Sequence, residues 1–422
     1  MEMTRVQLAQ GVNLTYLPAR KFKTSLLSAQ FVTPLRQETA GTNALLAAVL
    51  RRGTVSCPDM GALSARMDNL YDASIDYTVR KKGENQCVGF VASFIDDRYA
   101  PGGEHLLEPV AELLGELVCD PVTYHGRFVP EYFDSEKSNL LEAIRSIIND
   151  KRDWADSRLL RTLCAGEPYA VPRLGDEETV DKLQALRVYD QYRQLISTAP
   201  LEIIYSGSAD LERVRLALAA AFATLPREEV RMISAAVPHV GQETVQYVED
   251  ALDVTQGKLG MGFSCGSSDM PALLMGNTLF GGSSNSKLFL NVREKLSLCY
   301  YASSLYHRQK GLITVSSGIE FQNYQRAYDE IMAQLEAVQK GELEDWELEG
   351  ARSTLLNSYA TVGDSQGKLE NFYLGQAATG QTETPEALAR AIETMTADRI
   401  CQAMETVRLD TVYFLKGKEV EA

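Results

Sequence analysis

The sequence predicts an α+β protein built from two tandem homologous α/β-sandwich domains, each with an antiparallel sheet packed with helices. The first observation is a repeat: "ALLAAVLRRG" ends at Gly53, "ALLMGNTLFGG" reaches Gly281, and each precedes a helix-like segment. The second is that each half closes on a strand before a glycine, "LEIIYSG" and "DTVYFLKG". Runs of strands followed by runs of helices favour this class over a doubly wound parallel sheet.

The elements occur in the same order in both halves. The first half has a helix-like segment at 60–70, an alternating strand pattern at 86–96 and a helix whose apolar residues repeat every three and four positions from Leu106. The second half has the corresponding segments at 286–296 and 311–320, then a helix from Tyr324. Further on, "ETVDKLQALRVYDQYRQL" parallels "EALARAIETMTADRICQAM".

The boundary between the two copies is expected in the polar stretch 224–243. This gives an N-terminal domain at 1–228 and a C-terminal domain at 240–422. A length of 422 residues agrees with two or three domains at roughly 150 residues each. The offset between matching positions shrinks along the chain, so the second copy has the shorter loops.

Charge and apolar patterning exclude several classes of function. The chain has 42 basic and 57 acidic residues, a net charge of -15, which disfavours nucleic acid as a partner. Its longest apolar stretches, such as 216–225, are too short to cross a bilayer, and the N-terminus lacks the pattern of a secretion signal. Seven scattered cysteines without a C-x-x-C pair fit a reducing compartment, so we expect a cytoplasmic protein without a membrane anchor.

Histidine is scarce and dispersed. The four histidines are His105, His125, His239 and His307, and no two lie within one helical turn. This excludes a local H-x-x-x-H zinc motif.

Two short motifs favour a structural interpretation. "GFSCG" at 262–266 matches G-x-S-x-G, but the alternation around it makes Ser264 a polar-face position of a strand rather than a nucleophile. "FGGSSNSK" at 280–287 lacks the glycine that a phosphate loop needs before Lys287, so it predicts a turn that caps the next helix.

Three further segments leave their role open. The alanine- and leucine-rich segment 41–54 predicts a buried core helix. Asp134, Glu136 and Glu142 lie on one amphipathic helix, where solvated carboxylates are the ordinary case. Arg293 and Tyr300 are either a solvated helix charge and a half-buried strand residue, or a pair of long donors for a peptide carbonyl.

Taken together, these segments resemble the M16 (pitrilysin/insulinase-like) metallopeptidases of the M16B type. The resemblance covers essentially the whole chain. It rests on the duplication and on "FGGSSNSKLFLNVREKLSLCYYASS", "GEPYAVPRLGDEETVDKL" at 166–183 and "YSGSAD" at 205–210. It implies tandem LuxS/metalloenzyme-like α+β domains, two pairs of which close around a peptide chamber.

The sequence departs from that family at its metal motif. Active members carry H-x-x-E-H before a "GT", where two histidines bind zinc and the glutamate acts as general base. Alignment on Gly53 places Ala44, Ala47 and Ala48 at those positions, and the third ligand maps to a vestigial Glu142. Alanine offers no lone pair, so the resemblance implies no catalytic residue, no metal and no cofactor in this chain, with zinc in a partner.

The C-terminal copy keeps what the resemblance assigns to substrate binding. Arg293 and Tyr300 match the family's arginine/tyrosine pair, which binds the substrate backbone near the scissile carbonyl, although Ser297 replaces a family glycine. We therefore expect the inactive subunit of a bacterial heterodimer with an H-x-x-E-H subunit, one that binds a peptide substrate and is not catalytic alone. The alternatives are a non-hydrolytic structural or peptide-binding core protein, and an active peptidase with a non-standard metal site.

Overall fold

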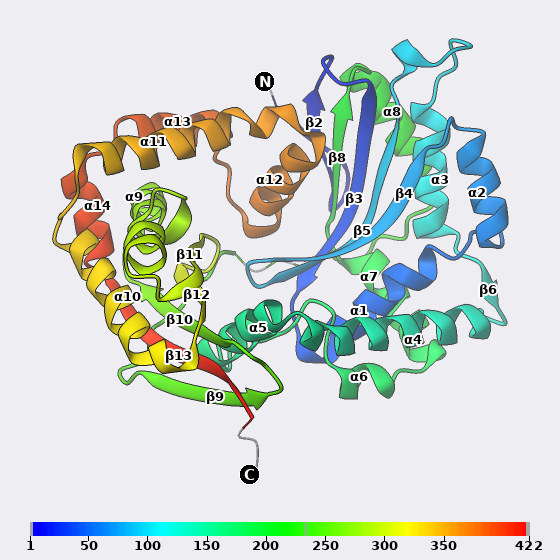
Figure 1. Cartoon of the computed structure of the whole chain (residues 1–422). Helices are drawn as coiled ribbons and strands as arrows, with labels where there is room; N and C mark the ends of the chain where they lie inside the picture. The colour runs from blue at the N-terminus through cyan, green and yellow to red at the C-terminus, as the bar shows by residue number, and fades with distance from the viewer. Residues whose placement is uncertain (1–2, 232, 234, 419–422) are drawn as a thin grey trace. The chain divides into compact units, whose positions relative to one another are not determined.

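The computed structural model describes residues 3–231, 233 and 235–418, and these form two compact units (Figure 1). Unit 1 comprises Met1–Arg145, Val171–Ala235 and Ser365–Thr382. Unit 2 comprises Ser146–Ala170, Ala236–Asp364 and Glu383–Ala422. Each unit therefore includes one segment from the other half of the chain. The domain boundaries at 228 and 240 are inferred from the sequence repeat, and they stay a prediction.

Unit 1 is a six-stranded sheet covered by helices, with strand order β1-β2-β8-β3-β5-β4. Its strands are β1 (Thr4–Ala9), β2 (Val12–Pro18), β3 (Thr24–Pro34), β4 (Ser74–Lys82), β5 (Asn85–Ile95) and β8 (Leu201–Gly207). Its helices are α1 (Gln37–Leu50), α2 (Met60–Asp68), α3 (Leu107–Cys119), α4 (Pro130–Ser146), α6 (Glu177–Asp181), α7 (Ala185–Thr198), α8 (Leu211–Ala221) and α12 (Gln366–Thr379).

Unit 2 is a five-stranded sheet with the order β11-β12-β10-β13-β9. Its strands are β9 (Gln246–Leu252), β10 (Gly257–Cys265), β11 (Cys299–His307), β12 (Leu312–Ile319) and β13 (Val407–Gly417). Its helices are α5 (Lys151–Leu163), α9 (Met270–Asn277), α10 (Tyr324–Gln339), α11 (Asp345–Ala360), α13 (Pro385–Glu393) and α14 (Ala397–Met404), with the π-helices η4 (Thr278–Gly282) and η5 (Leu288–Lys295).

The two sheets repeat one topology. From β2 to β4, unit 1 reads β2-β8-β3-β5-β4, and unit 2 reads β9-β13-β10-β12-β11 in the same sense. The predicted α+β architecture and the predicted strands at 86–96 and 311–320 are thus confirmed. One detail was wrong, because each sheet contains one parallel pair, β2–β8 or β9–β13. A parallel pair needs a long connection, and the strands and helices between its two members supply it.

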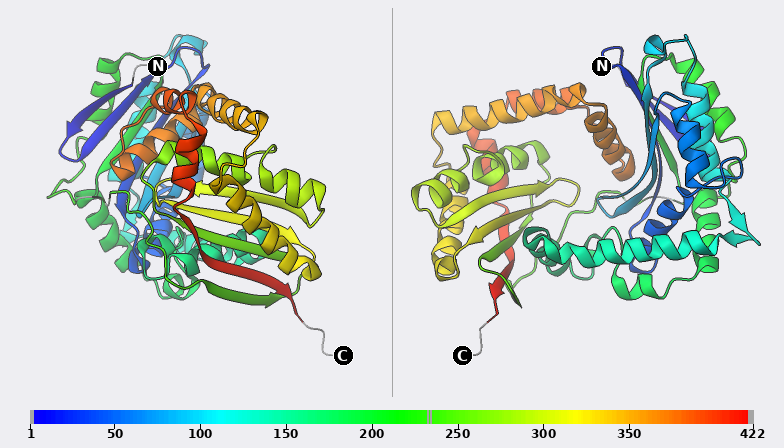
Figure 2. Two further views of the ribbon diagram at one scale, coloured as in Figure 1. Left: turned by 90° about the vertical axis from the view of Figure 1, so that its left-hand side faces the viewer. Right: turned by 45° about the vertical axis from the view of Figure 1, so that its right-hand side comes forward.

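In unit 1 the two faces of the sheet differ in chemistry. The helix-covered face carries the apolar core, in which Leu27, Ala29 and Phe31 of β3 are buried. On the other face α12 packs on β3 and β8, and the contacts are polar: Ser28 Oγ donates to Glu370 Oε1 over 2.7 Å. The right view of Figure 2 shows the blue strands between α12 and the cyan and green helices. Because both faces are covered, β3 reads as a nearly continuous buried run.

In unit 2, α5 packs closely on β10 because glycines face it. A Cβ added at Gly260 would lie 3.2 Å from a Leu159 methyl carbon, and one at Gly262 would lie 2.7 Å from a Leu163 methyl carbon. The alternate residues of the strand, Met261 and Phe263, lie in the apolar core. The "GFSCG" motif is therefore part of a strand that a helix approaches closely, which confirms the structural interpretation of Ser264.

No helix among the described residues is long and apolar enough to cross a membrane. The seven cysteines are all described, and none forms a disulfide. Burial raises the pKa of Cys87 to about 12, so that thiol is an inert part of the core.

Candidate functional site

Helix α1 carries the alanines at the predicted metal-motif positions. All its residues from Ala40 to Leu50 are buried, which confirms the predicted core helix over 41–50, although the helix ends at Leu50 and not at 54. Ala44 and Ala48 line a cavity of about 730 Å³ in unit 1, whereas Ala47 is buried and does not line it. Residues four positions apart lie on the same face of an α-helix, so Ala44 and Ala48 face the cavity together.

The rest of the cavity wall comes from β4, α4, α12 and one loop. The edge strand β4 contributes residues 77–82, and α4 contributes one face, formed by Glu136, Asn139, Leu140 and Ala143. Arg173, Leu174 and Asn371 complete the described lining. Glu142 is exposed and is not among the lining residues, because it lies on another side of α4. The structure thus brings Glu136, rather than Glu142, to the cavity that Ala44 and Ala48 line.

Glu136 is engaged in a structural ion pair. Its Oε1 accepts a hydrogen bond from Arg52 Nη1 at 2.8 Å, and the Arg52 guanidinium lies over the Tyr132 ring at 4.8 Å. Burial, and in second place the Glu136 carboxylate, raise the pKa of the neighbouring Tyr77, so that this phenol stays protonated and can donate. The described lining contains no histidine or cysteine. These residues do not fit a catalytic zinc ion, because two alanines and one arginine-paired carboxylate cannot hold it.

Arg293 lies in unit 2 on the π-helix η5, whose Leu288 and Val292 anchor it in the core. Its side chain is 40% exposed and lies over the Phe289 ring at 4.6 Å. Its nearest charge partner is Glu294, with Nη1 and Oε1 3.6 Å apart. The guanidinium is therefore held in place but open to solvent. π-Helical turns occur often at functional sites.

Tyr300 lies on β11, the edge strand of the unit 2 sheet. The register against β12 shifts between Cys299 and Tyr301, so Tyr300 is the extra residue of a β-bulge. Bulges on edge strands turn a side chain out of the regular alternation, and Tyr300 is 62% exposed. Its hydroxyl donates to Glu320 Oε1 at 2.9 Å, which raises the pKa of Tyr300 and keeps it protonated at neutral pH.

The structure places Arg293 and Tyr300 at one end of β11 without joining them. Helix η5 packs on β11. Burial raises the pKa of the Cys299 thiol, which precedes Tyr300, and the positive charge of Arg293 lowers that pKa in part. Between these two side chains, both described, no hydrogen bond forms. Arg293 presents N–H donors at the surface of unit 2, and Tyr300 lies there with its one O–H donated to Glu320.

Lys287 in "FGGSSNSK" is a structural residue. Its Nζ lies 3.0 Å from both carboxylate oxygens of Glu347, and both side chains are almost completely buried. Ser286 accepts from the backbone N–H of Phe289 at the start of the next helix. The segment is thus a helix-capping turn, as its sequence indicates, and its lysine is not available for phosphate.

Ser297 has a left-handed backbone, with φ of 48°. This conformation costs a non-glycine residue about 1–3 kcal/mol, whereas glycine adopts it freely at an entropic cost of about 0.5–1 kcal/mol. We expect Ser297→Gly to raise the free energy of unfolding by about 1 kcal/mol in urea titrations. The matched change Ser138→Gly, in the middle of α4, should lower it instead. A loss of stability in Ser297→Gly would contradict the strain assigned to this turn.

Comparison with known proteins agrees with this geometry. The family model described as "Peptidase M16 inactive domain" matches residues 182–355. The chain is 35% identical to a probable inactive metalloprotease of Bacillus subtilis, YmfF, over 97% of this chain and 96% of that protein. A conserved protein from Enterococcus faecalis has a similar structure, with a TM-score of 0.90, 27% identity and full coverage of both chains.

A peptidase M16 inactive domain protein from Pseudomonas fluorescens shares the fold, with a TM-score of 0.80 at 17% identity over 100% of this chain and 99% of that one. The B. subtilis match spans nearly the entire length of both proteins, and α1 carries alanine at the three positions where the metal motif is expected. The chain belongs to the peptidase M16 family, among its inactive, metalloprotease-like members.

Proposed function

We propose that this chain is the non-catalytic subunit of a two-chain M16B zinc peptidase in the cytoplasm. A partner with an intact H-x-x-E-H motif supplies zinc, water and general base. This chain supplies half of the peptide chamber and presents Arg293 and Tyr300 to the partner's substrate. The observation that carries the proposal is the split of functions: the motif positions on α1 are alanine, whereas the two donors on η5 and β11 are kept and exposed.

The edge strands support binding of an extended peptide. Strand β11 is the last strand of its sheet, and so is β4 beside the alanine-lined cavity. An edge strand presents backbone N–H and C=O groups that an added strand can pair with. A peptide bound along β11 would pass close to the bulge at Tyr300.

The chemistry of the two donors fits a role in the transition state. When water attacks a peptide carbonyl, negative charge develops on its oxygen, and fixed donors that meet this charge lower the barrier. Arg293 offers a permanent positive charge with several N–H groups, and Tyr300 offers one O–H, which has to turn from Glu320 Oε1 to meet the substrate. Neither group can activate water, so this chain alone should not hydrolyse peptides.

Reconstitution tests the proposal. The purified chain and its H-x-x-E-H partner are assayed separately and as an equimolar mixture with a peptide library, and complex formation is followed by light scattering. We expect a heterodimer and peptide cleavage only in the mixture. A partner that is fully active alone and is unaffected by this chain would refute a trans role.

The cavity in unit 1 favours one second candidate, a peptide-binding protein without hydrolysis. The cavity keeps about 730 Å³ and exposed polar wall residues such as Asn139 although its ligand positions are alanine. Peptide binding by the isolated chain, together with no cleavage in any mixture, would favour this candidate over the two-chain peptidase.

A further inference from the structure

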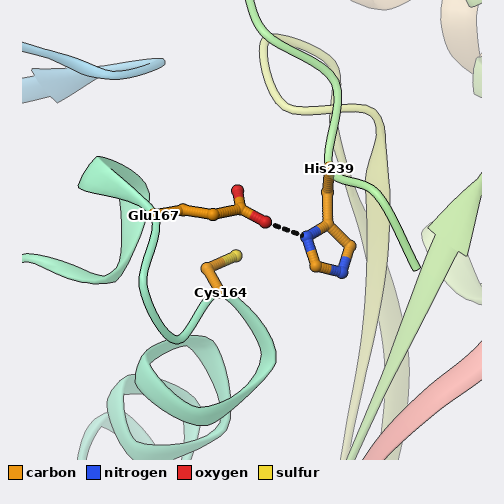
Figure 3. A group of neighbouring side chains, drawn as sticks. All are labelled: Cys164, Glu167 and His239. Atoms are coloured by element: carbon orange, nitrogen blue, oxygen red, sulfur yellow. Dashed lines mark hydrogen bonds and ion pairs between the residues drawn. The ribbon is translucent and has the colours of Figure 1, made fainter. Parts of the chain in front are cut away.

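A second group of potential metal ligands lies in unit 2, and only Glu167, in the segment 166–183, belongs to a motif noted in the sequence. Cys164 and Glu167 follow the end of α5, and His239 precedes β9. One ligand atom from each lies within 4.8 Å of those of the other two (Figure 3). Cys164 is completely buried, and the His239 side chain is 1% exposed. Glu167 is 26% exposed, so the group lies in the interior of unit 2 with one of its three residues reaching the surface.

Each nitrogen of the His239 ring faces a carboxylate. Nε2 lies 3.4 Å from Asp410 Oδ2, and Nδ1 lies 2.6 Å from Glu167 Oε1. Asp410 is buried and also accepts from the Gln242 backbone N–H and the Thr411 hydroxyl, so its orientation is fixed. Histidine ligands commonly donate their second N–H to a carboxylate, which fixes the tautomer and raises ligand basicity. Asp410 is placed for this role.

The 2.6 Å separation of His239 Nδ1 and Glu167 Oε1 fits a hydrogen bond with the proton on Nδ1. A zinc ion would take the place of that proton, with each ligand atom about 2.0–2.2 Å from the metal, so Nδ1 and Oε1 would move apart on binding. Lys310 does not compete for Oε1, because its buried ammonium contacts the other oxygen of Glu167, Oε2.

The position of Cys164 favours the metal. A soft thiolate, an imidazole and a carboxylate form a ligand set that suits zinc. The charges also balance, because the anions of Cys164, Glu167 and Asp410 are matched by Zn²⁺ and Lys310 together. The Lys310 ammonium and the burial of Cys164 and His239 leave little access for a substrate, so a zinc ion at this place would be structural.

We propose that Cys164, Glu167 and His239 bind one structural zinc ion, with Glu167 ligating through Oε1 and Asp410 orienting His239. The ion joins the loop after α5 to the segment before β9. The backbone N–H of His239 also donates to the carbonyl of Lys310 at 2.7 Å, so the site ties three segments of unit 2 together. This inference is independent of the proposed function, since it concerns neither α1 nor the Arg293 and Tyr300 donors.

Metal analysis of the full-length protein tests the site. The chain is treated with a chelator, reloaded with zinc, dialysed and analysed by mass spectrometry for bound metal. We expect about one zinc ion per chain, and a Tm that rises with zinc concentration. Replacement of zinc by cobalt should give a sulfur-to-cobalt charge-transfer band, because a thiolate is a ligand.

Variants separate this site from adventitious binding. Cys164→Ser keeps the volume of the side chain and should abolish the charge-transfer band and the zinc-dependent rise in Tm. Cys265→Ser, a buried thiol of β10 outside the group, should keep both. His239→Gln should lose zinc as well; if it does not fold, the serine variant still decides. A wild-type protein without stoichiometric zinc, or a Cys164→Ser protein that keeps it, would overturn the proposal.

Discussion

Replacement of Arg293 by alanine should lower the peptidase turnover of the reconstituted pair by about 10²–10³-fold, the usual cost of removing one donor that stabilises a transition-state oxyanion. The effect should fall on kcat more than on KM, because a contact made mainly in the transition state does not contribute to substrate binding. Tyr300→Phe removes a single hydroxyl and should cost about tenfold, which corresponds to about 1.4 kcal/mol.

The fold should not suffer from either change. Arg293 is 40% exposed and pairs only loosely with Glu294, and an exposed pair of this kind contributes about 0–1 kcal/mol. Lys295→Ala is the matched control, since it removes an exposed positive charge from the same π-helix. Its turnover should equal that of the wild type. If Arg293→Ala and Tyr300→Phe both behave like the control, these residues do not act on the partner's substrate.

The sequence predicts the elements of each domain better than their assembly. Alternating and three-to-four periodicity located β5, β12 and the helices after them, since periodicity reports which side of an element is buried. It does not report what covers that side. The packing of α5 on β10, for example, depends on glycines of β10 about 100 residues further along the chain.

The candidate site shows the same limit. The alanines on α1 and the lost zinc chemistry follow from the sequence, because alignment on Gly53 is local. Glu136 as the carboxylate at the cavity could not be chosen over Glu142 without the orientation of α4. The Cys164, Glu167 and His239 group could not be found by ligand spacing, since His239 lies 72 residues after Glu167 and Asp410 lies on the last strand.

Replacement of Glu370 by glutamine should destabilise unit 1 by about 3 kcal/mol. Glu370 lies on α12 with a side chain 4% exposed, and it accepts from Arg80 Nη1 at 2.6 Å and Nη2 at 2.7 Å. Burial alone would lower the pKa of Arg80, but the two hydrogen bonds to Glu370 outweigh it and raise the pKa. Loss of one partner from a buried pair leaves an uncompensated charge, at a cost of about 3–5 kcal/mol. The partial exposure of Arg80 favours the lower end of that range.

Hydrogen exchange of α12 and β4, together with urea unfolding, measures the effect where it arises. Glu177→Gln removes one partner of the exposed Arg145–Glu177 pair and should cost less than about 1 kcal/mol. The double variant Arg80→Met/Glu370→Leu should recover most of the loss, because apolar residues of similar volume remove both charges together. A single variant as stable as the wild type would mean that α12 is held to the sheet by its other contacts, such as Gln366 to Ser206, rather than by this ion pair.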